Sequence, residues 1–74
     1  MTQSVGRDRQ FNMAAWAKNA TAGDEIIYWE GEYCAGPHRV TAYGLSMAGV
    51  VILFQRRIAG KGGKFAYYAR RAKK

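Results

Sequence analysis

Regularly spaced apolar residues first occur after residue 10 of the chain. Four of them lie at the i, i+3, i+4 and i+7 spacing of one helical face: Met13, Trp16, Ala17 and Ala20. The alanines also favour a helix, and Gly23 suits the left-handed turn that often ends one. The pattern therefore predicts a short helix across Phe11–Ala20. Residues 1–9 are polar and charged and lack this spacing, which predicts a flexible arm.

Three later segments are rich in β-branched and aromatic residues, which favour strands. Asp24–Glu30 is the first of them. Val50–Ile58 starts with an unbroken apolar run, which indicates burial on both faces, and becomes polar at its end. Successive side chains of Lys64–Arg71 fall into two alternating sets, as on the two faces of a strand, and the segment follows a glycine-rich turn at Ala59–Gly63. The last two strands are therefore expected to form a hairpin.

A second helix is predicted between these strands, across His38–Ala48. Pro37 suits the start of this helix. One stripe of the helix carries four residues: Val40, Tyr43, Gly44 and Met47. A glycine inside a helix costs about 1 kcal/mol relative to alanine, so Gly44 indicates that a neighbouring element packs closely against the stripe.

The two faces of the hairpin follow from the position of its turn. If the turn is centred on Lys61–Gly62, Ile58 pairs with Phe65. The expected core face then carries Ile52, Phe54, Ile58, Phe65 and Tyr67, with Arg56 at its margin. The opposite face carries Gln55, Arg57, Lys64, Tyr68 and Arg70. A shift of the pairing by one residue would exchange the two faces.

The expected order of elements is helix, strand, helix and hairpin. This order predicts an α+β fold in which the three strands form a small antiparallel sheet. The chain has 74 residues, enough for one domain, which we place at residues 10–74. No repeat or internal linker divides this domain.

Positive charge is concentrated in the second half of the chain. Residues 1–37 carry three Lys or Arg and five Asp or Glu, whereas residues 38–74 carry nine Lys or Arg and neither Asp nor Glu. So asymmetric a distribution points to an anionic partner such as DNA or RNA. The residues expected to bind it lie on the second helix, the hairpin and its last strand: Arg39, Thr41, Ser46, Arg56, Arg57, Lys61, Lys64, Tyr68, Arg70 and Arg71.

The sequence lacks the residues that several other classes of protein need. Zinc sites usually require four Cys or His ligands and this chain offers Cys34 and His38, so we expect no metal and no other cofactor. The few carboxylates cluster on or beside the first strand without a partner base, so we expect no enzymatic activity. The longest apolar run has five residues against the roughly 20 that span a bilayer, so we expect no membrane segment. The absence of a recognisable signal peptide and the single cysteine predict a cytoplasmic location.

The predicted order of elements, ending in a hairpin with a glycine tip and basic arms, resembles a reduced winged helix-turn-helix across about residues 10–72. The resemblance implies that the helix before the hairpin enters a DNA groove with three polar residues: Arg39, Thr41 and Ser46. It also implies that the hairpin acts as a wing whose phosphate contacts come from Arg57, Lys61, Lys64 and Arg70. A full winged helix has two helices between its first strand and the hairpin, whereas residues 34–49 have room for one.

Three segments, Gly23–Tyr28, Val51–Arg57 and Phe65–Tyr68, are also similar to small proteins of phages and proteobacteria, which implies a phage origin. The function that follows is a DNA-binding or transcription-associated regulator. The alternative is a phage inhibitor or modulator that binds an acidic host protein such as RNA polymerase. An RNA-binding module with tyrosines exposed on its sheet is a third possibility. A homodimer is compatible with each of them, because so small a core gains from a second copy.

Overall fold

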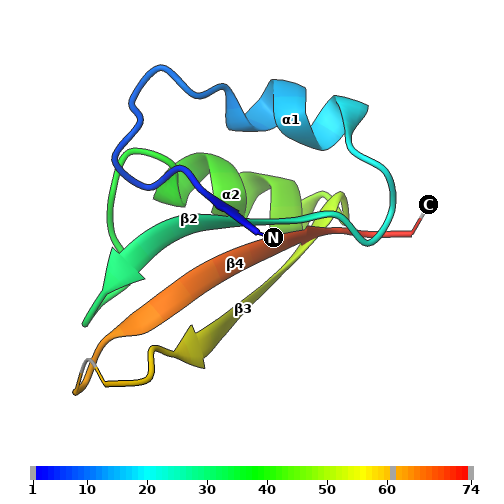
Figure 1. The fold of residues 1–74 in the computed structure, drawn as a ribbon. Helices are drawn as coiled ribbons and strands as arrows, with labels where there is room; N and C mark the ends of the chain where they lie inside the picture. The colour runs from blue at the N-terminus through cyan, green and yellow to red at the C-terminus, as the bar shows by residue number, and fades with distance from the viewer. Residues whose placement is uncertain (1, 61, 74) are drawn as a thin grey trace.

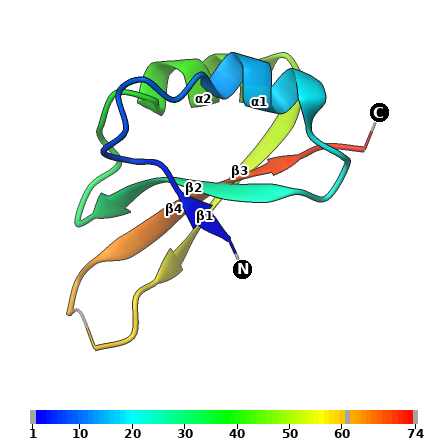
Figure 2. The same ribbon diagram turned by 45° about the horizontal axis from the view of Figure 1, so that its top comes forward.

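The computed structural model describes residues 2–60 and 62–73. Their strands and helices follow in the order β1 (Gln3–Ser4), α1 (Met13–Asn19), β2 (Glu25–Gly31), α2 (Arg39–Met47), β3 (Val51–Arg57) and β4 (Phe65–Arg71). Both helices lie on one face of the sheet (Figure 1, Figure 2), and we call the other face, which no described helix covers, the open face. The α+β fold expected from the sequence is confirmed.

The sheet has four strands in the order β1-β2-β4-β3, and β4 pairs antiparallel with both β2 and β3. The expected three-stranded antiparallel sheet is incomplete, because β1 joins β2 in parallel. The Val5 N–H donates to the Ile27 carbonyl oxygen at 2.8 Å, and the Val5 side chain is 2% exposed. Part of the expected flexible arm therefore belongs to the sheet and the core. A single valine among polar residues has no periodicity that would reveal it.

Small side chains bring the helices close to the sheet. Three alanines, one each from α1, α2 and β4, are no more than 1% exposed: Ala17, Ala42 and Ala69. The larger buried side chains that surround them include Met13, Ile26, Tyr28, Val51 and Tyr67. Asn12 caps the start of α1, because its Oδ1 accepts a hydrogen bond from the Ala15 N–H at 2.9 Å. The core is thus a thin layer between the two helices and one face of the sheet.

The pairing of β3 with β4 differs by one residue from the expected register. Phe65 pairs with Arg57 rather than with Ile58. The Ile58 N–H instead donates to the Lys64 carbonyl oxygen at 3.0 Å and closes the turn. The turn bends at two glycines with positive φ, Gly60 and Gly63. Ile58 therefore faces Lys64 rather than Phe65, which shifts the pairing of the two strands by one residue.

This shift exchanges the two faces of β3. Val51 is 2% exposed beneath the helices, whereas Ile52 is 52% exposed on the open face. The expected core positions of Ile52 and Phe54 are wrong, while those of Phe65 and Tyr67 in β4 are confirmed. An unbroken apolar run contains no alternation, so it cannot show which of its side chains point inward.

The apolar stripe of α2 faces solvent, contrary to the expected close packing. Val40, Tyr43 and Met47, which we call the α2 stripe, are 74%, 62% and 72% exposed. Nothing lies within 4 Å of a Cβ atom built on Gly44. The side of α2 that faces the sheet carries Ala42, which is fully buried. Apolar residues occur on several sides of this helix, so their spacing alone does not identify the buried side.

Candidate nucleic-acid interface

The β3–β4 hairpin projects beyond both helices (Figure 1). Its far end carries three exposed cations, Arg56, Arg57 and Lys64, which we call the hairpin cations. Lys61, which the sequence placed in the same group, lies outside the described residues. Within residues 2–60 and 62–73 one salt bridge is found, between Arg70 and Glu25. None of the three hairpin cations is paired with a carboxylate of these residues. The end of the hairpin therefore concentrates positive charge away from the helices.

Two aromatic rings stack on the open face, beside Arg56. Arg57 was expected on the face that carries Tyr68, but the shifted register turns it to the other face, where its guanidinium carbon lies 5.9 Å from the Phe65 centroid. The centroids of the Phe54 and Tyr68 rings are 4.9 Å apart, and the ring planes differ by 8°. The Arg56 guanidinium carbon lies 5.2 Å and 5.1 Å from the two centroids, and that of Arg70 lies 4.9 Å from the Phe54 centroid. Cation–π attraction at such distances holds a guanidinium in place without using its N–H donors. The sequence pattern predicts Tyr68 on this surface but misses Phe54, because its face depends on the register.

The acids of β2 border the same face. Oε2 of Glu25 accepts a hydrogen bond from Nε of Arg70 at 2.8 Å and forms a salt bridge with Nη2 of the same side chain, also at 2.8 Å, so this cation is partly neutralised. Glu30 lies in the same row of the sheet as Arg56, with Ala66 of β4 between them. Positive charge therefore lies toward β3 and the turn, and negative charge lies along β2. The hairpin cations are better placed than Arg70 to meet a polyanion.

Arg71 belongs to the expected binding residues but uses its donors inside the molecule. Its Nε donates to the Ala17 carbonyl oxygen of α1 at 2.6 Å. Its Nη1 donates to the carbonyl oxygens of Ala72 at 2.8 Å and Val50 at 3.4 Å. The side chain therefore ties α1 to the sheet and spends its Nε and Nη1 donors on the backbone, which leaves Nη2 for a phosphate.

We expect Arg71→Gln to lower the free energy of unfolding by about 2 kcal/mol, because it leaves three partly buried carbonyl groups without their donor. Urea unfolding followed by circular dichroism measures the loss. The matched change Arg57→Gln, at an exposed arginine of the hairpin, should stay within about 0.5 kcal/mol of the unaltered chain. Equal losses for the two variants would contradict a structural role for Arg71.

The structure separates the expected residues of α2 from those of the open face. Arg39 and Thr41 are exposed near the start of α2, and Ser46 is half-buried. α2 covers one face of the sheet (Figure 2), whereas the side chains of Tyr68 and Arg56 lie on the open face. One flat ligand surface therefore cannot include both groups.

Tyr28 and Cys34 form a further pair of neighbouring polar groups. The Tyr28 hydroxyl and Cys34 Sγ lie 3.6 Å apart. Burial raises the pKa of the Tyr28 hydroxyl, and Cys34 and Tyr67 add to this effect, so the phenol stays protonated at neutral pH. In the described part of the chain no group of three or more His, Cys, Asp or Glu side chains is placed to hold a metal ion. None of the helices described there is long and apolar enough to cross a membrane.

No protein-family model, curated protein or solved structure matches this chain. What the chain does must therefore be inferred from its own residues. The hairpin cations, together with the aromatic pair that Arg56 covers, are the candidate interface.

Proposed function

We propose that this chain is a non-enzymatic DNA-binding protein, associated with transcription, whose β3–β4 hairpin contacts phosphates. The observation that carries the proposal is the group of three exposed cations at the end of a hairpin that projects past the helices (Figure 1). Two of them are arginines, whose planar guanidinium pairs with phosphate oxygens in a bidentate way. Arg56 is also held over two rings, which reduces the freedom that it would lose on binding.

The order of elements supports a reduced winged helix as the architecture behind this function. α2 precedes the hairpin, and β4 lies between β2 and β3 in the sheet. In such an arrangement the hairpin is the wing and contacts the DNA backbone. Arg39 and Thr41 at the start of α2 are the residues available for a groove. We give the main role to the hairpin, because the rest of the exposed side of α2 is apolar.

Fluorescence anisotropy of a labelled DNA duplex, measured over a range of salt concentrations, tests the proposal. Each phosphate contact contributes about −0.9 to the slope of log K against log salt. We expect the double variant Arg56→Gln/Arg57→Gln to make the slope shallower by about 2 and to weaken binding at low salt by tenfold or more. Single-stranded DNA and RNA of equal length serve as competing ligands.

The control for this experiment removes the same charge elsewhere. Lys18 lies on α1 and Lys73 follows β4, and both are exposed. The double variant Lys18→Gln/Lys73→Gln should change the slope by less than about 1. Identical slopes for the two double variants would mean that the hairpin is not the contact, and no binding at low salt would remove the proposal altogether.

A second candidate function, binding to an acidic host protein such as RNA polymerase, is favoured by the α2 stripe. Tyrosine and methionine are enriched at protein interfaces, whereas DNA-binding surfaces are strongly cationic. The chain would then be a phage-encoded modulator that acts in the host cytoplasm. A pull-down from nuclease-treated lysate with the unaltered chain and with Val40→Ser/Tyr43→Ser/Met47→Ser separates the two functions. A partner that only the unaltered chain retains would favour protein binding.

A further inference from the structure

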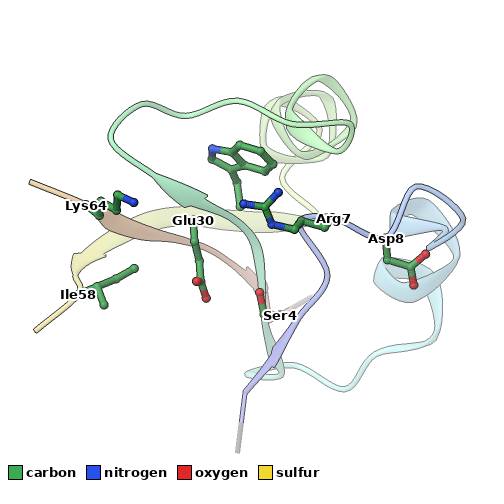
Figure 3. A pocket seen from close by; sticks show the side chains of 8 residues that line it. Ser4, Arg7, Asp8, Glu30, Ile58 and Lys64 are labelled. Atoms are coloured by element: carbon green, nitrogen blue, oxygen red, sulfur yellow. The ribbon is translucent and has the colours of Figure 1, made fainter. Parts of the chain in front are cut away.

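Two hollows meet at the outer edge of β2. β1 ends at Ser4, and the chain then turns away from β2 with a hydrogen bond from the Asp8 N–H to the Val5 carbonyl oxygen at 3.0 Å. The larger hollow, of about 540 Å³, lies between this turn and the end of the hairpin (Figure 3), and its lining includes Ser4, Arg7, Trp29, Glu30 and Lys64. The smaller one, of about 450 Å³, has a lining that includes Arg7, Arg9, Trp29 and Pro37.

A β-bulge and three glycines place the indole of Trp29 at these hollows. The register of β2 against β4 shifts between Ile27 and Trp29, and such bulges redirect side chains. A Cβ atom on Gly36 would overlap Cε3 of the indole and lie 2.9 Å from Cζ3. A Cβ atom on Gly31 would lie 3.0 Å from Nε1, and one on Gly6 would lie 3.3 Å from Cε3. The backbone therefore packs directly against part of the ring, and the ring also lines both hollows.

The two hollows differ in charge. Arg7 and Arg9 line the smaller one, whose lining contains no carboxylate among the described residues. Figure 3 shows the Arg7 guanidinium directed toward β2 and the Asp8 carboxylate directed away from it. In the larger hollow, the Ser4 hydroxyl and the Glu30 carboxylate can accept hydrogen bonds from the N–H groups of a ligand. The larger hollow also contains two cations, Arg7 and Lys64, so it combines acceptors with positive charge, whereas the charged side chains of the smaller one are both arginines. A cationic hollow and a mixed polar hollow on either side of one indole match the phosphate and the base of a nucleotide.

We infer that these hollows bind one nucleotide, with its base against the indole of Trp29 and its phosphate between Arg7 and Arg9. Bases stack on aromatic side chains, and guanidinium groups bind phosphate in pairs of hydrogen bonds. The larger hollow falls within the range of roughly 300–1,000 Å³ that is typical of ligand sites. A free mononucleotide and the phosphorylated end of a strand share this chemistry. The inference goes beyond the proposed function, because it does not involve Arg56 or Arg57.

A fluorescence titration of Trp16→Phe tests the inference, because the chain has two tryptophans and this variant keeps only Trp29. The probe is GMP, with guanosine and inorganic phosphate as the two fragments. We expect GMP to change the emission saturably and to bind at least about tenfold more tightly than either fragment. Arg7→Gln and Arg9→Gln should each weaken GMP binding by about tenfold. The matched change Lys18→Gln, on α1, should weaken it by less than about twofold.

Three results would overturn the inference. The first is no saturable change of emission with millimolar GMP, and the second is an equal response to inorganic phosphate, which would mean an ion site only. The third is that Lys18→Gln weakens GMP binding as much as Arg7→Gln and Arg9→Gln do. Displacement of GMP by a 5′-phosphorylated oligonucleotide, but not by its unphosphorylated form, would identify a strand end as the source of the ligand. Displacement by mononucleotides alone would identify a free nucleotide. Calorimetry on the unaltered chain repeats the titration if Trp16→Phe does not fold. Arg56→Gln/Arg57→Gln should leave GMP affinity unchanged, so the two proposals can fail separately.

Discussion

Replacing Gly36 with alanine is expected to lower the free energy of unfolding by about 3 kcal/mol, a large share of the total for a chain of this size. Gly36 has a φ of 91°, a conformation that costs a residue with a side chain about 1–2 kcal/mol. The new methyl group would also overlap the indole of Trp29, and overpacking costs about 1–3 kcal/mol. Urea unfolding followed by circular dichroism measures the sum of both effects.

Gly23 provides the control that separates them. Its φ is 95°, but nothing lies within 4 Å of a Cβ atom built on it. Gly23→Ala should therefore cost about 1 kcal/mol, the backbone effect alone. In a Trp29→Leu background the loss from Gly36→Ala should shrink toward the same value, because the overlapping ring is gone. Equal losses at Gly23 and Gly36 in the unaltered background would mean that the indole does not rest on Gly36.

Val51→Asp is expected to cost about 4 kcal/mol or more and to leave the chain largely unfolded at room temperature. The carboxylate would be buried among apolar side chains without a partner. Ile52→Asp makes a similar change one residue later, but on the open face and opposite Arg70. It should cost about 1 kcal/mol or less. Circular dichroism and thermal unfolding of the two variants give the comparison.

Alanine replacements keep this comparison measurable when Val51→Asp does not fold. Val51→Ala should cost about 2 kcal/mol and Ile52→Ala less than about 1 kcal/mol, because the first leaves a cavity and the second does not. The turn that the sequence suggests puts Ile52 in the core and requires the reverse order. A larger loss at Ile52 than at Val51 would therefore contradict the observed pairing of β3 with β4.

The helices and the longer strands could be predicted because each has a local signal. Helical spacing marks α1, and β-branched and aromatic composition marks β2 and the hairpin. Which face of β3 and which side of α2 point toward the core could not be predicted in the same way. Whether Val51 or Ile52 faces the core depends on the register that the β3–β4 turn sets. The buried side of α2 depends on which element packs beneath this helix. Both are decided by tertiary packing, which overrides local preference.

The candidate site was predictable to a similar degree. Charge alone identified Arg56, Arg57 and Lys64, because acids are missing from that half of the sequence. Charge could not distinguish Arg71, whose donors go to backbone carbonyl groups far from it in the chain. The surroundings of Trp29 were not visible either. They depend on three glycines from separate segments and on a bulge, and none of these has a sequence signal that points to the indole.

The place of β4 in the sheet has a consequence for the synthesis of the chain. β4 follows the other strands and helices of the described residues, yet it lies between β2 and β3 and is the strand that joins them. A ribosome makes the chain from its N-terminus, so β2 and β3 remain unjoined until residue 71 has left the exit tunnel. Until then the apolar run of β3 has no sheet to enter and stays open to chaperones and to aggregation. A translation stop anywhere before residue 65 would leave a nascent polypeptide that cannot close its sheet.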